Sequence, residues 1–224
     1  MIKTLSILLV DDHPIIIDAY KNSLNQYKKN NNYHLLIDSA YCCETALQCI
    51  ENRSNSKSYN IVFIDIRLPP SKDGKFNSGK DLAYYFKKEF SDTKIIIITG
   101  YYDPLTLGQI LQSVNPDGLL FKGDIGQTTI NDVMTDILNG IPSYSATILK
   151  LLRQKISSDI VLNKIDKQLL YELSKGSKTK DLTKTIPLSI GGIEKRKRHL
   201  KEVFGTCKKD DSELIDAAIH KGFI

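Results

Sequence analysis

Residues 5–14 read LSILLVDDHP, an apolar run that ends abruptly at two aspartates. Near-continuous apolar runs of this length are typical of parallel strands that helices cover on both faces. We predict strands near residues 5–10, 35–40, 60–65, 94–99 and 118–122. Amphipathic stretches of helical length follow them, near residues 14–27, 43–52, 79–90, 103–113 and 128–139. This alternation predicts an α/β fold with a doubly wound, five-stranded parallel sheet.

The pattern changes after residue 140. Residues 140–143, Gly-Ile-Pro-Ser, interrupt it, and an apolar stretch with interspersed basic residues follows. Four more helical segments are expected near residues 167–175, 178–184, 189–203 and 212–221, without a strand among them. We therefore predict an α/β domain over residues 1–140, a linker with its own helix over residues 141–160, and a small all-α domain over residues 161–224.

Composition narrows the class of protein. Of 224 residues, 41% are hydrophobic and 25% charged, which excludes wholesale disorder. The longest apolar runs fall far short of the roughly 20 residues of a membrane span, and no secretion signal is recognisable. The four cysteines lack the spacing of a metal site or a disulfide framework, which favours a reducing compartment. We expect a cytoplasmic protein with no membrane partner.

Charge is distributed unevenly along the chain. Residues 161–224 carry 14 Lys and Arg against 9 Asp and Glu, whereas the first 160 residues are balanced. The net charge of +5 therefore comes from the C-terminal part. A basic block on an otherwise neutral chain predicts a polyanionic partner, with nucleic acid favoured over an anionic membrane.

Acidic residues follow two of the predicted strands: Asp11 and Asp12 end the first, and Asp65 ends the third. Because parallel strands end at the same edge of a sheet, we expect these carboxylates to converge and to repel one another unless a cation is bound. Hard oxygen ligands suit Mg²⁺. Thr99 and Lys122 end the fourth and fifth strands and add a hydroxyl and an ammonium group. Each residue alone has an ordinary structural explanation, but together they predict phosphoryl chemistry on a carboxylate nucleophile.

The stretches LLVDDHP, VFIDIRLP, IIIITG and LLFKGD, over about residues 4–140, resemble the receiver domains of two-component response regulators. The resemblance implies a flavodoxin-like fold in which Asp65 is the phospho-acceptor. It assigns Mg²⁺ to Asp11, Asp12, Asp65 and the backbone carbonyl of Arg67. It makes Thr99 the switch hydroxyl and pairs Lys122 with the phosphoryl group. Pro69, four residues after Asp65, also matches.

The sequence departs from this family at two places. The aromatic switch residue, expected three positions before the lysine, is replaced by Leu119, and the loop over residues 70–78 is longer than in most receivers. Tyr101 is expected at the mouth of the pocket, where it slows attack by water on the acyl phosphate. A surface tyrosine is the alternative explanation.

Residues 189–205, SIGGIEKRKRHLKEVFG, predict one helix that Ser189 caps and Gly205 ends. Ile193, Leu200, Val203 and Phe204 recur at helical spacing and should face a core. Five cations within seven residues should cover the other faces: Lys195, Arg196, Lys197, Arg198 and Lys201. A solvated face is the ordinary explanation of such a run. A basic helix that follows a short helix and a turn has instead the geometry of a helix-turn-helix in the major groove.

Residues 161–224 resemble the DNA-binding domain of NarL/LuxR-type regulators. The match rests on Leu169-Leu170, Gly176, Lys180-Asp181-Leu182, Ser189, Ile193, Gly205, Ala217-Ala218-Ile219 and Gly222. The resemblance implies that Glu194, Lys195 and Arg198 face base edges. It places Lys178, Lys180 and Arg196 on phosphates. Gly191-Gly192 departs from the family, and each glycine weakens the first helical turn by about 1 kcal/mol relative to alanine.

Together these features predict a transcriptional regulator. A histidine kinase transfers a phosphoryl group to Asp65, and this controls homodimerisation and sequence-specific binding to double-stranded DNA. The receiver is not an enzyme beyond catalysing its own phosphorylation and dephosphorylation. Leu119 and the long loop leave open a phosphorylation-independent DNA-binding regulator, whose receiver is a dimerisation or docking module. A free-standing phosphohydrolase with Asp65 as nucleophile is less favoured, because no second acid or base is evident.

Overall fold

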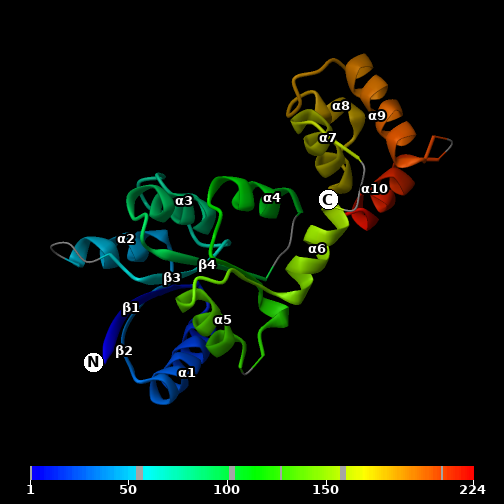
Figure 1. The fold of residues 1–224 in the computed structure, drawn as a ribbon. Coiled ribbons are helices and arrows are strands. Elements are labelled where there is room, and N and C mark those ends of the chain that lie inside the picture. The colour runs from blue at the N-terminus through cyan, green and yellow to red at the C-terminus, as the bar shows by residue number, and fades with distance from the viewer. Residues whose placement is uncertain (1, 54–57, 101–103, 127, 157–159, 208) are drawn as a thin grey trace. The chain divides into compact units, whose positions relative to one another are not determined.

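The computed structural model describes residues 2–53, 58–100, 104–126, 128–156, 160–207 and 209–224. Contacts divide the chain into two compact units, one of residues 1–102 and 109–148 and one of residues 103–108 and 149–224. The first contains a sheet with helices on both sides, and the second is all helical (Figure 1). Among the described residues, no helix combines the length and apolar character that crossing a bilayer requires.

The first unit is built on a parallel sheet. Its strands are β1 (Lys3–Val10), β2 (Tyr33–Ala40), β3 (Ile61–Asp65), β4 (Lys94–Thr99), β5 (Gly118–Phe121) and β6 (Ser143–Tyr144). They lie in the order β2-β1-β3-β4-β5-β6, and all pairs are parallel. The order reverses between β1 and β3, and ligands of such folds bind at the carboxyl ends of the strands at this point.

Helices cover both faces of this sheet. They are α1 (Pro14–Asn31), α2 (Cys43–Asn52), α3 (Gly79–Glu89), α4 (Pro104–Ser113) and α5 (Thr129–Leu138), with a 3-10 turn η1 (Lys122–Asp124) after β5. Figure 1 shows α1 and α5 on one face and α2, α3 and α4 on the other. Every residue of β3 is buried, and its first four residues, Ile61–Ile64, are all apolar, as expected for a strand covered on both faces.

The sheet therefore has six strands, one more than the five predicted from the sequence. Ser143 and Tyr144 form a sixth strand beside Gly118 and Leu119 of β5. Two half-buried residues next to a proline carry no hydrophobic pattern, so a signal based on apolar runs does not find them. The short strand also shows that part of the stretch expected as linker extends the sheet.

The second unit contains α7 (Lys164–Ser174), α8 (Thr179–Leu182), α9 (Ile190–Phe204) and α10 (Asp211–His220), and α6 (Ala146–Ile156) precedes it. Its core contains Leu169, Leu182, Ile193, Leu200 and Leu214, all nearly inaccessible to solvent. The ends expected for α9 are confirmed. The Ser189 hydroxyl accepts a hydrogen bond from the Gly192 amide at 3.2 Å, and Gly205 adopts a left-handed conformation with φ of 72°. The helix expected over residues 178–184 is shorter, a single turn.

Candidate functional site

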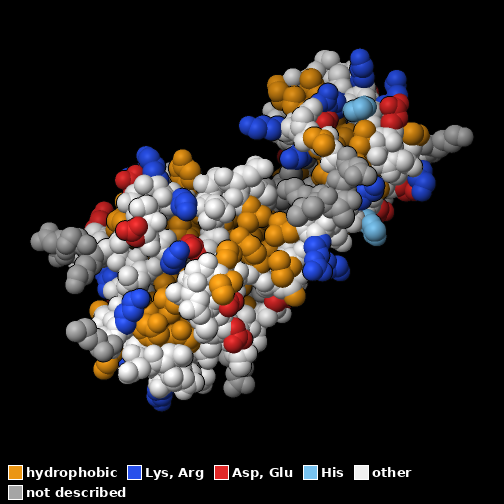
Figure 2. All heavy atoms as spheres, viewed as in Figure 1, with side chains coloured by type: hydrophobic (Ala, Val, Ile, Leu, Met, Phe, Trp, Pro, Cys, Tyr) orange, Lys and Arg blue, Asp and Glu red, His pale blue; other side chains and the backbone are white. Residues whose placement is uncertain are grey.

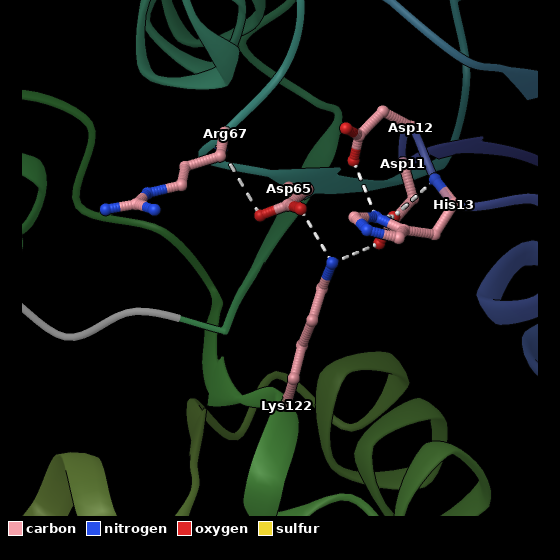
Figure 3. A network of polar contacts seen from close by, with 6 residues as sticks. All are labelled: Asp11, Asp12, His13, Asp65, Arg67 and Lys122. Carbon is pink, nitrogen blue, oxygen red and sulfur yellow. Dashed lines mark hydrogen bonds and ion pairs between the residues drawn. The ribbon is translucent and has the colours of Figure 1, made fainter.

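The carboxyl ends of β1, β3 and β5 bring three of the expected side chains together. The ammonium group of Lys122 lies 2.6 Å from Oδ2 of Asp65 and 2.7 Å from Oδ2 of Asp11 (Figure 3). Asp11 and Asp65 are buried, with 2% and 4% of their surfaces exposed. One cation thus bridges two buried carboxylates, and the convergence expected from the sequence is present.

Burial controls the protonation of this group. Burial raises the pKa of Asp65, and the neighbouring Asp11 carboxylate raises it further, while Lys122 and the Arg67 amide act in the opposite direction. For Lys122, burial lowers the pKa, but hydrogen bonds and ion pairs to Asp11 and Asp65 outweigh it, so the net pKa is raised. Lys122 is therefore held charged, and Asp65 is a carboxylate whose negative charge is poorly solvated.

The geometry of the acidic cluster fits a hard divalent cation. One ligand atom from each of Asp11, Asp12, His13 and Asp65 lies within 4.8 Å of the others. The clustered carboxylates carry more negative charge than Lys122 neutralises, which is the condition under which a cation binds favourably. The described residues can therefore hold a divalent metal at the reversal of strand order.

His13 is a member of this cluster that the sequence analysis did not single out. Its Nδ1 lies 2.7 Å from Oδ1 of Asp12 and 3.1 Å from Oδ1 of Asp11, and its backbone amide donates to Asp11 at 3.0 Å. The signal was its adjacency to the two aspartates in the stretch LLVDDHP. Histidine is also a common metal ligand, so its position next to both aspartates was informative.

The remaining expected site residues lie as follows. Thr99 is buried at the end of β4, and in the sheet register it is opposite Phe121, the residue before Lys122. The backbone amide of Arg67 donates to Oδ1 of Asp65 at 3.3 Å, while its side chain extends away from the carboxylates (Figure 3). The metal-binding role expected for the Arg67 carbonyl stays a prediction. Tyr101 lies outside the described residues.

The long loop after β3 is ordered by its own contacts. The Ser71 amide donates to the Phe76 carbonyl at 2.8 Å, and the Phe76 amide donates to the Ser71 hydroxyl at 3.0 Å. The Phe76 ring is buried against Tyr85 of α3, edge to face, with ring centroids 5.3 Å apart. The loop is thus a compact structure packed on α3.

Gly79 begins α3 immediately after this loop and lies against β3, the strand that ends at Asp65. Its amide donates to the Ile66 carbonyl at 2.9 Å, and a Cβ at this position would lie 1.7 Å from the carbonyl oxygen of Asp65. Only glycine fits such an approach. The backbone that carries Asp65 is therefore fixed by the start of α3.

The helical unit carries the second candidate site. Five of the six residues expected to contact DNA have exposed side chains: Lys178, Lys180, Glu194, Lys195 and Arg198. Figure 2 shows Lys and Arg side chains distributed over the surface of this unit. The exposed basic side chains of α8 and α9 are available to phosphates and base edges.

Two cations of α9 do not have the environment that the sequence analysis expected. Arg196 binds Asp166 with Nε at 2.5 Å from Oδ1 and an Nη at 3.3 Å from Oδ2, so its role on phosphate stays a prediction. The expectation that Lys197 covers an outer face is wrong: it is 8% exposed and lies 2.6 Å from Asp211. Position 197 falls on the same helical face as Ile193, Leu200 and Phe204, which explains its burial.

Curated relatives extend over nearly the whole chain. The oxygen regulatory protein NreC of Staphylococcus epidermidis is 21% identical over 229 residues, covering 97% of this chain and 98% of the relative. The transcriptional regulatory protein RcsB of Escherichia coli strain K12 is 25% identical over 198 residues, covering 87% of this chain and 85% of the relative.

Solved structures of RcsB have a similar fold. RcsB from Salmonella enterica serovar Typhimurium, bound to promoter P1flhDC in the presence of the phosphomimetic BeF3−, gives a TM-score of 0.66 at 18% identity and covers 96% of this chain and 98% of that one. A structure of two RcsB dimers bound to two parallel DNAs gives 0.65 at 18% identity and covers 97% and 99%. At this level of identity, the similarity supports the two-part fold.

The family model of the response regulator receiver domain matches residues 7–128, more than half of the chain. This range contains Asp11, Asp65 and Lys122, the three residues that the structure joins by ion pairs. The sheet order and the acidic cluster agree with the same assignment. The chain therefore belongs to the response regulator receiver family.

Proposed function

We propose that this protein is the transcription-regulating response regulator of a two-component system, with Asp65 as its phospho-acceptor. The observation that carries the proposal is the buried pair of carboxylates that share Lys122 at the reversal of strand order. A partner histidine kinase donates the phosphoryl group: the N–P bond of phosphohistidine breaks, and a P–O bond to an Asp65 oxygen forms. The protein acts on no other substrate and catalyses only the gain and loss of this group.

Mg²⁺ is the metal we propose for the acidic cluster, held by Asp11, Asp12, Asp65 and the Arg67 carbonyl. When bound, the ion offsets negative charge on the transferred phosphoryl oxygens. Lys122 pairs with one of these oxygens, and the Thr99 hydroxyl donates to another. The fit of hard oxygen donors to a small divalent cation supports this choice of metal.

The helical unit, which we assign to residues 161–224, is proposed to bind double-stranded DNA as a homodimer. The receiver would comprise residues 1–140 and the linker residues 141–160. Lys195, Arg198 and Glu194 would meet base edges, and Lys178, Lys180 and Arg196 the phosphates. The positive balance of residues 161–224 and the DNA-bound dimers of the related RcsB support the proposal. The cytoplasm, where kinase domain and DNA are both accessible, is the proposed location.

The test of the acceptor is chemical. The full chain is incubated with acetyl phosphate and Mg²⁺ and examined by intact mass spectrometry, with Asp65→Ala in parallel. We expect one acid-labile phosphoryl adduct on the wild type and none on the variant. EDTA should abolish the adduct. An undiminished adduct on Asp65→Ala would show that another residue is the acceptor.

A second candidate function is a DNA-binding regulator that works without phosphorylation, its receiver serving as a dimerisation or docking module. The observation that favours it is Leu119, a fully buried residue at the position where an aromatic switch is expected. Affinity for duplex DNA and oligomeric state, measured for wild type and Asp65→Ala under phosphorylating conditions, separate the two functions. Equal values for both proteins favour this second function, and a difference favours the first.

A further inference from the structure

The 3-10 turn that begins with Lys122 is bonded to the start of the linker helix. Asp124, the last residue of this turn, accepts two hydrogen bonds from Thr147: one from the backbone amide at 2.8 Å and one from the hydroxyl at 2.9 Å. Thr147 is the second residue of α6. The carboxylate of Asp124 therefore caps a helix to which it is not adjacent in sequence.

A second set of bonds joins β5, the strand before this turn, to Ser145, the residue before α6. The Phe121 amide donates to the Ser145 hydroxyl at 3.0 Å, and the Ser145 amide donates to the Leu119 carbonyl at 3.2 Å. Ser145 is buried, and Ile148 at the start of α6 is 1% exposed. The segment that leads into α6 is thus bonded both to β5 and to the 3-10 turn.

The chemistry of Asp124 agrees with this capping role. Burial raises its pKa, but hydrogen bonds from the Thr147 amide, the Ser145 hydroxyl and the Thr147 hydroxyl outweigh it, and the net pKa is lowered. A negative charge near the amino end of a helix is also favoured by the helix dipole. The ionised form of Asp124 is the one that holds α6.

The turn between Lys122 and Asp124 is short and tightly packed. The Ile125 amide donates back to the Lys122 carbonyl at 3.3 Å, and a Cβ on Gly123 would lie 2.5 Å from the ring of Phe121. The backbone between Lys122, which contacts Asp65, and Asp124, which caps α6, therefore has little freedom to move. A shift of the Lys122 backbone is transmitted to Asp124 because the two residues belong to one turn.

We propose that Asp124, through its bonds to Thr147 and together with Ser145, couples the position of Lys122 to the linker helix α6. The inference rests on the proposed function, since a phosphoryl group on Asp65 is what changes the contacts of Lys122. Asp124 and Thr147 are positioning residues, because they bond to each other and act on Asp65 only through Lys122. α6 continues beyond the first unit, so its amino end is a route by which the state of Asp65 reaches the rest of the chain.

Hydrogen exchange measured on the full chain tests the coupling. Exchange of α6 amides is followed by mass spectrometry before and after Mg²⁺ and beryllofluoride, a mimic of the acyl phosphate, are added. Wild type should show a change of about 5-fold or more in α6 exchange, the lower end of typical allosteric couplings. In Asp124→Ala and Thr147→Val the change should fall toward 1-fold.

Thr129→Val is the matched control. The Thr129 hydroxyl accepts a hydrogen bond from the Gly126 amide at 2.8 Å in the loop that follows the turn, at the start of α5 rather than of α6. This variant should respond as wild type does. Should Asp124→Ala fail to fold, Thr147→Val decides, because it removes only one hydroxyl.

The outcomes separate this inference from the proposed function. Acetyl phosphate labelling with Mg²⁺ is measured on each protein. A wild type that takes no phosphoryl group overturns the proposed function and this inference with it. A wild type that is labelled but shows no change in α6 exchange overturns the coupling alone. The coupling is also overturned if Asp124→Ala and Thr147→Val are labelled and respond as strongly as wild type.

Discussion

Asp65 lies in an environment that costs stability. It is buried beside Asp11, and both carboxylates depend on the one ammonium group of Lys122. A buried charge without a full counter-charge destabilises the folded state, and functional groups are often placed in this way. The raised pKa of Asp65 expresses the same cost, because folding disfavours its ionised form.

Asp65→Asn should therefore stabilise the metal-free protein. The pKa of Asp65 is raised by folding, so the penalty is present at pH values above the folded pKa and vanishes below the unfolded one, about 4. We expect the free energy of unfolding to rise by about 1 kcal/mol near neutral pH and the difference to disappear as pH falls below about 4. Urea unfolding in EDTA at several pH values measures it. Asp92→Asn, at an exposed aspartate, should have no effect, and an equal gain there would contradict the explanation.

Gly79→Ala is predicted to disturb β3, the strand that ends at Asp65. The added Cβ would lie 1.7 Å from the Asp65 carbonyl oxygen, so α3 or β3 must move, at a cost of about 1–3 kcal/mol. Gly191→Ala is the control: no atom lies within 4 Å of its added Cβ, and alanine favours a helix over glycine by up to about 1 kcal/mol. Thermal unfolding should thus move in opposite directions for the two variants. A shift in the same direction would show that close approach is not the cause.

The residues of the site were predictable to the extent that strand ends and family motifs place them. Asp11, Asp65 and Lys122 converge because parallel strands share one carboxyl edge, which the apolar runs already indicate. His13 was not predicted as a member of the cluster. It follows the end of β1, and only the local backbone conformation brings its side chain back to Asp12. The cap that Asp124 forms on α6 joins positions 23 apart in sequence, and no local pattern encodes it.

At the scale of elements, the spacing of hydrophobic residues explains which strands and helices were predicted correctly and which were not. Strands β3, β4 and β5 were found because nearly all of their residues are buried, and β1 and β2 because they carry apolar runs, whereas β6 is two half-buried residues. In α9 the cap residues and the apolar positions were predictable. The run of basic residues gave no sign that some of its side chains are paired within the unit and others are exposed. Lys197 and Arg196 point to partners within the unit, and Lys195 and Arg198 are exposed.

This division predicts different effects for neighbouring lysines of α9. Lys195→Ala should leave stability unchanged and weaken binding of the phosphorylated protein to duplex DNA, with the slope of log affinity against log salt falling by about 0.9 if one phosphate contact is lost. Lys197→Ala should reduce the stability of the helical unit, because it leaves Asp211 without its closest cation. Fluorescence anisotropy across a salt series and urea unfolding measure the two effects.

Lys221→Ala serves as the control for charge alone, since Lys221 is exposed at the end of α10, outside α8 and α9. Its salt slope should match that of wild type. If Lys195 and Lys221 variants lose the same slope, the attraction is a diffuse property of the basic unit, and α9 has no special place in it.

The whole molecule is two units with distinct cores and distinct electrostatics. The first core gathers residues of α1, α5 and the sheet, and the second gathers residues of α7 to α10. The first 160 residues are balanced in charge, and the remainder is basic. Sequence predicted this division from composition and periodicity, which are local quantities. It did not predict how the start of α6 is bonded to β5, because that depends on contacts between distant segments.

Because the cores share no residue, substitutions in the two units should act independently. Asp211 in the helical unit has a pKa shifted in the opposite direction to that of Asp65. Burial raises the pKa of Asp211, but Lys197 and Lys201 outweigh it, and the net pKa is lowered. A lowered pKa contributes stability that is present above the unfolded value, about 4, and is lost as pH falls through the folded value.

Asp211→Asn should thus destabilise the helical unit near neutral pH, by only about 0.5–1 kcal/mol because the side chain is partly exposed to solvent, and the loss should vanish in acid. Combined with Asp65→Asn, it should leave the receiver transition shifted upward and the helical transition shifted downward, each by its single-variant amount. Calorimetry together with hydrogen exchange resolves the two units. One shared transition at an intermediate temperature would mean that the units unfold as a single cooperative structure, since independent units keep their separate shifts.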